Sequence, residues 1–157
     1  MRPRVGAEQD EQYCVVASWR DSASQEAQDD LDGLLNDVLP FAQQQLDKNG
    51  AFFPYGMVIG ASGYSRMIAA DLGNGEQPAC VDVLALLVDG LRRDRDQLRA
   101  VALVSDVRTA DSDAVRVELE HREGAAMAVL LPYIKKRFRR GVEYGSLAGV
   151  TASPIVW

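Results

Sequence analysis

One stretch of the chain, residues 113–133, alternates strictly between apolar and charged side chains. Its first half places Val115, Val117 and Leu119 on one side and Arg116, Glu118, Glu120 and Arg122 on the other. This alternation indicates a β-strand with one buried face and one exposed face. Glu123-Gly124 supplies a turn, and residues 126–131 return as a more apolar strand. The stretch therefore predicts a β-hairpin that leaves one charged face open.

Length and charge exclude several classes of protein. A chain of 157 residues is long enough for one domain with a single core. Its net charge of −6 disfavours general nucleic-acid binding, because proteins that follow phosphates are usually basic. No apolar run is long enough for a secretory signal or a membrane span, so we expect no membrane contact. Cys14 and Cys80 form neither a disulfide framework nor a C-x-x-C pair, which predicts a cytoplasmic location and leaves a single disulfide open.

Apolar residues at steps of three and four predict two helices. The first begins at Ser22 or Ser24, kinks or restarts at Pro40 and ends at Asn49-Gly50. The second covers residues 80–98. Their inward-facing stripes are Leu31, Leu34, Leu35, Val38, Leu39, Ala42 and Leu46, and then Val81, Leu84, Leu87, Val88 and Leu91.

The remaining apolar segments predict strands. Residues 52–60 and 64–71 form a hairpin, and residues 100–107 precede the hairpin of residues 113–133. The order α-β-β-α-β-β-β predicts an α+β fold with a single five-stranded, mainly antiparallel sheet and two helices packed on one face. Residues 1–21 are expected to be a loose N-terminal segment, leaving residues 22–157 as a single domain. Within it, residues 141–157 are expected to be irregular and to dock Ile155, Val156 and Trp157 onto the body.

His121 is the only histidine, and it falls in phase with the apolar residues of its strand. Imidazole can act as a general base or a metal ligand, but no second histidine, cysteine pair or nucleophile accompanies it. The glycine-containing loops match neither phosphate-binding fingerprint. The sequence therefore predicts no catalytic residue, no metal site and no cofactor. A small-ligand or enzyme pocket near His121, Glu120 and Tyr133 remains an alternative.

Two charged clusters are candidate binding surfaces. Glu118 and Glu120 could flank a substrate, pair with cations on neighbouring strands, or form part of an electrostatic interface. Residues 135–140 hold five basic residues in six, namely Lys135, Lys136, Arg137, Arg139 and Arg140. That run could contact phosphates with Phe138 stacked on a base, protect a sheet edge, or meet the acidic first helix of another copy.

Three short segments carry a resemblance to known proteins. Phe53-Pro-Tyr-Gly56, residues 113–124 and Leu131-Pro-Tyr133 resemble small uncharacterised bacterial proteins that join a helix, a hairpin, a helix and a three-stranded end. The resemblance covers roughly residues 30–157. It implies that α+β fold and brings no assigned activity or site residue. The order of elements is also similar to that of roadblock-type dimerisation modules, a likeness of fold alone.

These features favour a non-catalytic cytoplasmic protein-interaction module that also forms a homo-oligomer. Its partner would be a protein of unknown identity. The expected binding residues are Arg116, Glu118, Glu120 and Arg122 on the open face, with Lys135, Lys136, Arg137, Arg139 and Arg140 along the charged edge. The alternatives are a ligand-binding protein or enzyme with a pocket near His121, and an anionic-polymer binder using residues 135–140.

Overall fold

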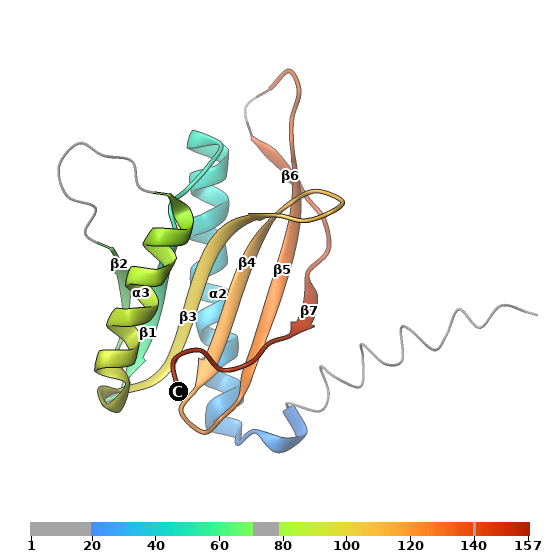
Figure 1. Ribbon diagram of the computed structural model, residues 1–157. Helices are drawn as coiled ribbons and strands as arrows, with labels where there is room; N and C mark the ends of the chain where they lie inside the picture. Colours follow the sequence, from blue (N-terminus) through green and yellow to red (C-terminus); the bar gives the residue numbers. More distant parts are fainter. Residues whose placement is uncertain (1–19, 71–78, 140) are drawn as a thin grey trace, which may run out of the picture.

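The computed structural model describes residues 20–70, 79–139 and 141–157, and it has the α+β architecture that the sequence predicts (Figure 1). The expected loose segment falls almost entirely on residues 1–19, outside the described residues. The helices are α2 (Gln25–Asn49) and α3 (Cys80–Asp94), with a short 3-10 helix η1 (Arg95–Gln97). The strands are β1 (Tyr55–Gly60), β2 (Ser65–Ala69), β3 (Leu98–Arg108), β4 (Asp113–His121), β5 (Ala126–Lys135), β6 (Val142–Tyr144) and β7 (Ala148–Thr151). Neither described helix is long and apolar enough to cross a membrane.

The strands form one antiparallel sheet of seven strands, not the five expected. Its order is β2-β1-β3-β4-β5-β6, and β7 also pairs with β5. The two short strands share one edge, because β6 pairs with the end of β5 and β7 with its beginning. Both come from residues 141–157, which were expected to be irregular. With three and four residues, they are too short to show an alternating pattern.

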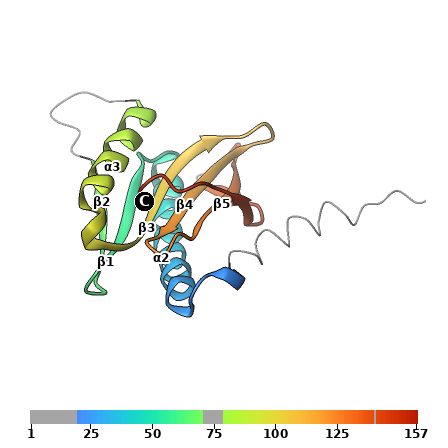
Figure 2. The same cartoon turned by 60° about the horizontal axis from the view of Figure 1, so that its bottom comes forward.

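The two helices cover opposite faces of the sheet, so the prediction that both pack on one face is wrong (Figures 1 and 2). In β3, Ala102 and Val104 belong to the core beneath α2, whereas Val101 belongs to the core beneath α3. A strand buried on both faces is apolar at every position. The unbroken apolar run of residues 100–104 is the sequence signal for this two-sided burial.

The ends of α2 follow local chemistry. The Ser24 hydroxyl accepts the Ala27 N–H at 3.1 Å, which caps the first turn and confirms one of the two predicted starts. At the other end Gly50 has a φ of +72°, and its N–H donates to the Leu46 carbonyl. Between these points the helix continues through Pro40 and does not restart there. Its 25 residues therefore span the sheet from the β4–β5 turn to the start of β1.

Candidate functional site

The charged residues predicted on the open face of β4 have different environments. Arg116 and Glu118 are half-buried and pair with each other at 3.2 Å. Arg122 is exposed just beyond the end of β4. Glu120 is only 4% exposed, because Ile155 and Val156 bind to its carboxylate. The sheet face is therefore charged and accessible only in part.

Glu120 holds the terminal segment, defined here as residues 152–157. Its carboxylate oxygens accept the N–H groups of Ile155 at 3.0 Å and of Val156 at 3.1 Å. The carbonyls of the same two residues accept hydrogen bonds from α3 and η1: Arg92 Nε donates to Ile155 at 2.6 Å, and Arg95 donates to Val156 at 3.3 Å. The predicted docking of this segment is confirmed.

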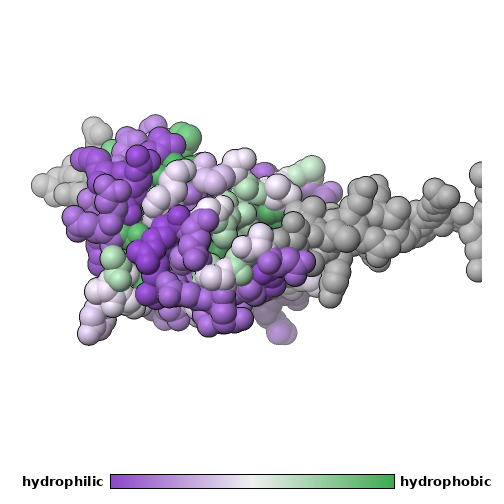
Figure 3. All heavy atoms as spheres, turned by 90° about the horizontal axis from the view of Figure 1, so that it is seen from below, coloured by the Kyte–Doolittle hydropathy of each residue, from purple (hydrophilic) through white to green (hydrophobic). Residues whose placement is uncertain are grey.

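His121 belongs to a buried network that joins three elements. Its ring is 1% exposed, and Nε2 lies 3.0 Å from Asp30 Oδ2 of α2. The Glu123 backbone N–H donates to Nδ1 at 3.2 Å, so we assign the neutral ring that donates through Nε2. Arg99 of β3 donates a hydrogen bond from its guanidinium to each Asp30 carboxylate oxygen, at 2.8 and 2.9 Å. These hydrogen bonds raise the pKa of Arg99. The network lies at an end of the molecule whose surface is mainly hydrophilic (Figure 3).

Two residues of this network, together with the neighbouring Glu26, could ligate a metal. One ligand atom each from Glu26, Asp30 and His121 lie within 4.8 Å of one another. However, the Arg99 guanidinium already supplies the positive charge, with two bonds to Asp30 and a 3.6 Å approach to Glu26. A divalent cation would have to displace this arginine. The arrangement is that of a structural ion network connecting α2 to β3 and β4.

Tyr133, which was expected near His121, lies at the other end of the sheet. It pairs with Asp113, the first residue of β4, whereas His121 is the last. Eight residues of extended chain separate the two positions by about 26 Å. The Tyr133 hydroxyl instead donates to Asp106 at 2.6 Å. The structure therefore does not bring His121 and Tyr133 into one pocket.

Part of the basic run lies beside the end of α2. Lys135, Lys136 and Arg139 join Lys48 around a hollow of about 210 Å³. Phe138 is almost fully exposed beside them, with Arg137 5.9 Å from its ring centre. Arg140 lies outside the described residues. The run thus forms an accessible basic surface at the β5–β6 connection.

Large apolar side chains are exposed on both sides of the sheet edge where β2 is the outermost strand of the described part. Met67 of β2 faces the α2 side, whereas Leu86 and Val81 belong to α3 on the other side, and Tyr64 precedes β2. We call the outer edge of β2 and the neighbouring side of α3 the β2–α3 surface. Tyr64 is 82% exposed, and Val81, which was predicted to face inward, is 72% exposed. The sequence patterns did not predict this surface. Its signal is that α3 has apolar residues at more positions than the buried stripe of Val83, Leu87 and Leu91 requires.

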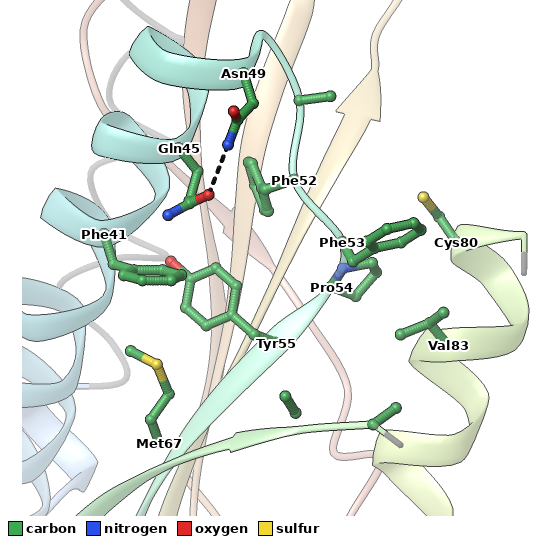
Figure 4. Close-up of a pocket in the computed structure, with 13 residues that line it drawn as sticks. Phe41, Gln45, Asn49, Phe52, Phe53, Pro54, Tyr55, Met67, Cys80 and Val83 are labelled. Atoms are coloured by element: carbon green, nitrogen blue, oxygen red, sulfur yellow. Dashed lines mark hydrogen bonds between the residues drawn. The ribbon is translucent and has the colours of Figure 1, made fainter. Parts of the chain in front are cut away.

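An aromatic hollow of about 570 Å³ lies between the end of α2, the start of β1 and the start of α3 (Figure 4). Its lining includes Phe41, Phe52, Phe53, Tyr55, Met67, Cys80 and Val83. The rings of Phe41 and Tyr55 meet edge to face with centres 4.9 Å apart. The side-chain amides of Gln45 and Asn49 border the hollow and share a 3.1 Å hydrogen bond.

Comparison of the chain with protein-family models, with curated proteins and with solved structures finds no match.

Proposed function

We propose that this protein is a non-catalytic cytoplasmic protein-interaction module that self-associates through the β2–α3 surface. The observation that carries the proposal is the outermost position of β2 in the described sheet, with Met67 and Leu86 exposed on the elements beside that edge. The exposed thiol of Cys80 suits a reducing compartment.

The edge position of β2 supports pairing with a second copy. An edge strand presents unpaired N–H and C=O groups, and natural proteins usually protect such strands with charges, prolines or bulges. β2 reads Ser-Arg-Met-Ile-Ala, with Arg66 as its single charge and regular pairing to β1. A second β2 can add to it antiparallel across a two-fold axis, so that the same residues serve both copies.

The charges of α3 favour the same arrangement. Asp82 lies in its first turn, and Arg92 and Arg93 lie in its last turn, followed by Asp94. An antiparallel α3 from a second copy would therefore bring opposite charges together. Because α3 and β2 line a common hollow, one interface can include both elements.

In this proposal the predicted charged residues contact a different partner. Arg116, Glu118 and Arg122, with the described residues of the basic run, remain accessible to a protein of unknown identity. Glu120 is no longer proposed as a contact, because it already binds the terminal segment.

Sedimentation velocity over a range of protein concentrations tests self-association. We expect Met67→Lys and Leu86→Lys to weaken it about ten-fold or more, since each places an unpaired charge in an apolar interface. Ile134→Lys is the matched control, because Ile134 is also exposed but lies on β5. If Met67→Lys and Leu86→Lys associate as the unchanged chain does, the β2–α3 interface is wrong.

The aromatic hollow favours a second candidate function, the binding of a small apolar ligand. Its volume lies within the usual range for ligand sites, and amide groups border an otherwise apolar lining. Native mass spectrometry of the protein purified from its own host would show such a ligand as added mass. We expect that mass to be lost in Phe52→Ala. A spectrum that shows only whole multiples of the chain mass would count against this candidate.

A further inference from the structure

The terminal segment is held on the sheet mainly through its backbone groups, as a bound peptide is held by its receptor. Ile155 and Val156 each contribute one N–H and one C=O, and all four groups have hydrogen-bond partners. The Val156 side chain is 1% exposed in the core between α3 and the sheet. We call the groove that holds these two residues the seat. Three elements contribute to it: Glu120 of β4, Arg92 of α3 and Arg95 of η1.

The chemistry of the seat specifies its ligand. A buried carboxylate is costly unless hydrogen bonds satisfy it, and Glu120 receives two from successive N–H groups. An occupant must therefore offer two consecutive residues other than proline, flanked by carbonyls that the arginines can reach. It must also place a compact apolar side chain where Val156 lies. The described chain supplies these features just after Pro154, whose missing N–H is not needed.

Only a short connection joins this ligand to the rest of the fold. β7 ends at Thr151, and Ala152, Ser153 and Pro154 lead to the first bound residue. A residue that precedes a proline favours extended conformations, which suits a segment that projects away from β7. Since the bonds in the seat do not depend on which chain supplies the segment, a copy in trans makes the same contacts as one in cis.

We propose that the seat is a peptide-binding site that accepts the terminal segment of a second copy, so that two chains can exchange residues 152–157. The identical segment is the occupant whose fit the seat already displays. The proposal does not depend on the β2–α3 surface, which is formed by other residues.

Complementation between two full-length variants tests the exchange. Both carry Met67→Lys, so that association through β2 does not contribute. One also carries Glu120→Leu, which spoils the seat and leaves the segment intact. The other also carries Val156→Asp, which spoils the segment and leaves the seat intact. We expect the mixture to form a 1:1 complex in native mass spectra, at about ten-fold or more the dimer fraction of either variant alone.

Controls separate exchange from loss of fold. Circular dichroism establishes that each variant folds. If the Val156→Asp variant does not fold, Val156→Thr, which keeps the side-chain volume, replaces it. Glu118→Leu is the matched control for Glu120→Leu. Because its seat is intact, its own terminal segment stays bound there, and it should form much less complex with the Val156 variant. Folded variants that remain monomeric when mixed, or a complex that forms equally well with Glu118→Leu, would overturn the proposal.

Discussion

Asp30 is the residue at which three elements of the protein meet. It extends from α2 and bonds to Arg99 of β3 and to His121 of β4. The sequence places Asp30 among several aspartates of an acidic helix, and nothing local distinguishes it from them. Its importance comes from non-local partners that lie 69 and 91 residues away in the chain.

Replacing Asp30 should therefore be costly. We expect Asp30→Ala to lower the free energy of unfolding by about 3 kcal/mol, because it leaves Arg99 and His121 without their shared acceptor. Asp32→Ala is the matched control, since its pair with Arg20 is largely exposed and worth at most about 1 kcal/mol. Urea unfolding followed by circular dichroism measures both. Equal losses would show that the Asp30 network does not stabilise the fold as argued.

Glu120 and Glu118 provide a second contrast on the same strand. Glu120→Gln retains one oxygen acceptor and leaves one N–H of the terminal segment unpaired, so we expect a loss of about 1–3 kcal/mol in unfolding free energy. Glu118→Gln removes a half-exposed ion pair and should cost less than about 1 kcal/mol. The same urea titration compares them, and a larger loss for Glu118→Gln would contradict this assignment.

The alternation of side chains along β4 predicts the face of the sheet on which each of these residues lies. It does not predict which part of the chain covers that face. The phase of β4 correctly placed His121 inward and Glu120 on the other face. It could not show that residues 155–156, far along the chain, would bury Glu120. The covering segment has no periodic pattern of its own, so its contacts required the structure.

Asp106 gives the protein a pH dependence of known sign. Burial raises the pKa of Asp106, while the hydrogen bond from Tyr133 opposes that shift. A raised pKa in the folded state means that this group stabilises the fold most when protonated, below its ordinary pKa of about 4. That stability is lost as the pH rises through the raised value.

We therefore expect Asp106→Asn to increase the free energy of unfolding near neutral pH, because the amide oxygen can still accept from Tyr133 without carrying a charge. The gain should disappear by about pH 3, where the carboxyl is protonated in both states. Thermal unfolding at a series of pH values measures the difference. A variant that is less stable than the unchanged chain at neutral pH would reverse the assigned sign.

At the scale of elements, local signals located the hairpins and the ends of α2. The polar cap at Ser24 and the glycines at positions 50, 63 and 124 lie where the chain caps or turns, and these three glycines have positive φ. Such signals depend on a few neighbouring residues and are visible in the sequence. Which face of the sheet a helix covers depends on its partners, and that is where the prediction failed.

Replacing a glycine by alanine should have opposite effects on the free energy of unfolding in β1 and in α2. A Cβ on Gly56 of β1 would lie 2.8 Å from the Ala102 carbonyl oxygen, so Gly56→Ala should cost about 1–3 kcal/mol. A Cβ on Gly33 of α2 meets nothing within 4 Å, so Gly33→Ala should stabilise by about 0.5–1 kcal/mol. Chemical denaturation of both variants tests the pair. A stable Gly56→Ala would mean that β1 and β3 can separate at little cost.

At the scale of the whole molecule, the charges of α3 predict that two variants which each weaken self-association restore it when combined. Arg93→Asp and Asp82→Arg should each weaken self-association several-fold, because each places like charges opposite one another in an antiparallel pair of helices. The double variant restores opposite charges and should recover most of the affinity. Sedimentation at low ionic strength gives the clearest comparison. Additive losses in the double variant would exclude this orientation of α3.

The two short strands β6 and β7 have a consequence for the size of any assembly. Together they cover the edge of β5, whereas among the described residues no strand pairs with the outer edge of β2. A copy that adds through β2 uses the open edge of both partners at once, and the outer edges of the combined sheet end in short strands. Addition of strands would therefore stop at two copies, so an edge strand that can pair with another copy would not lead to fibres.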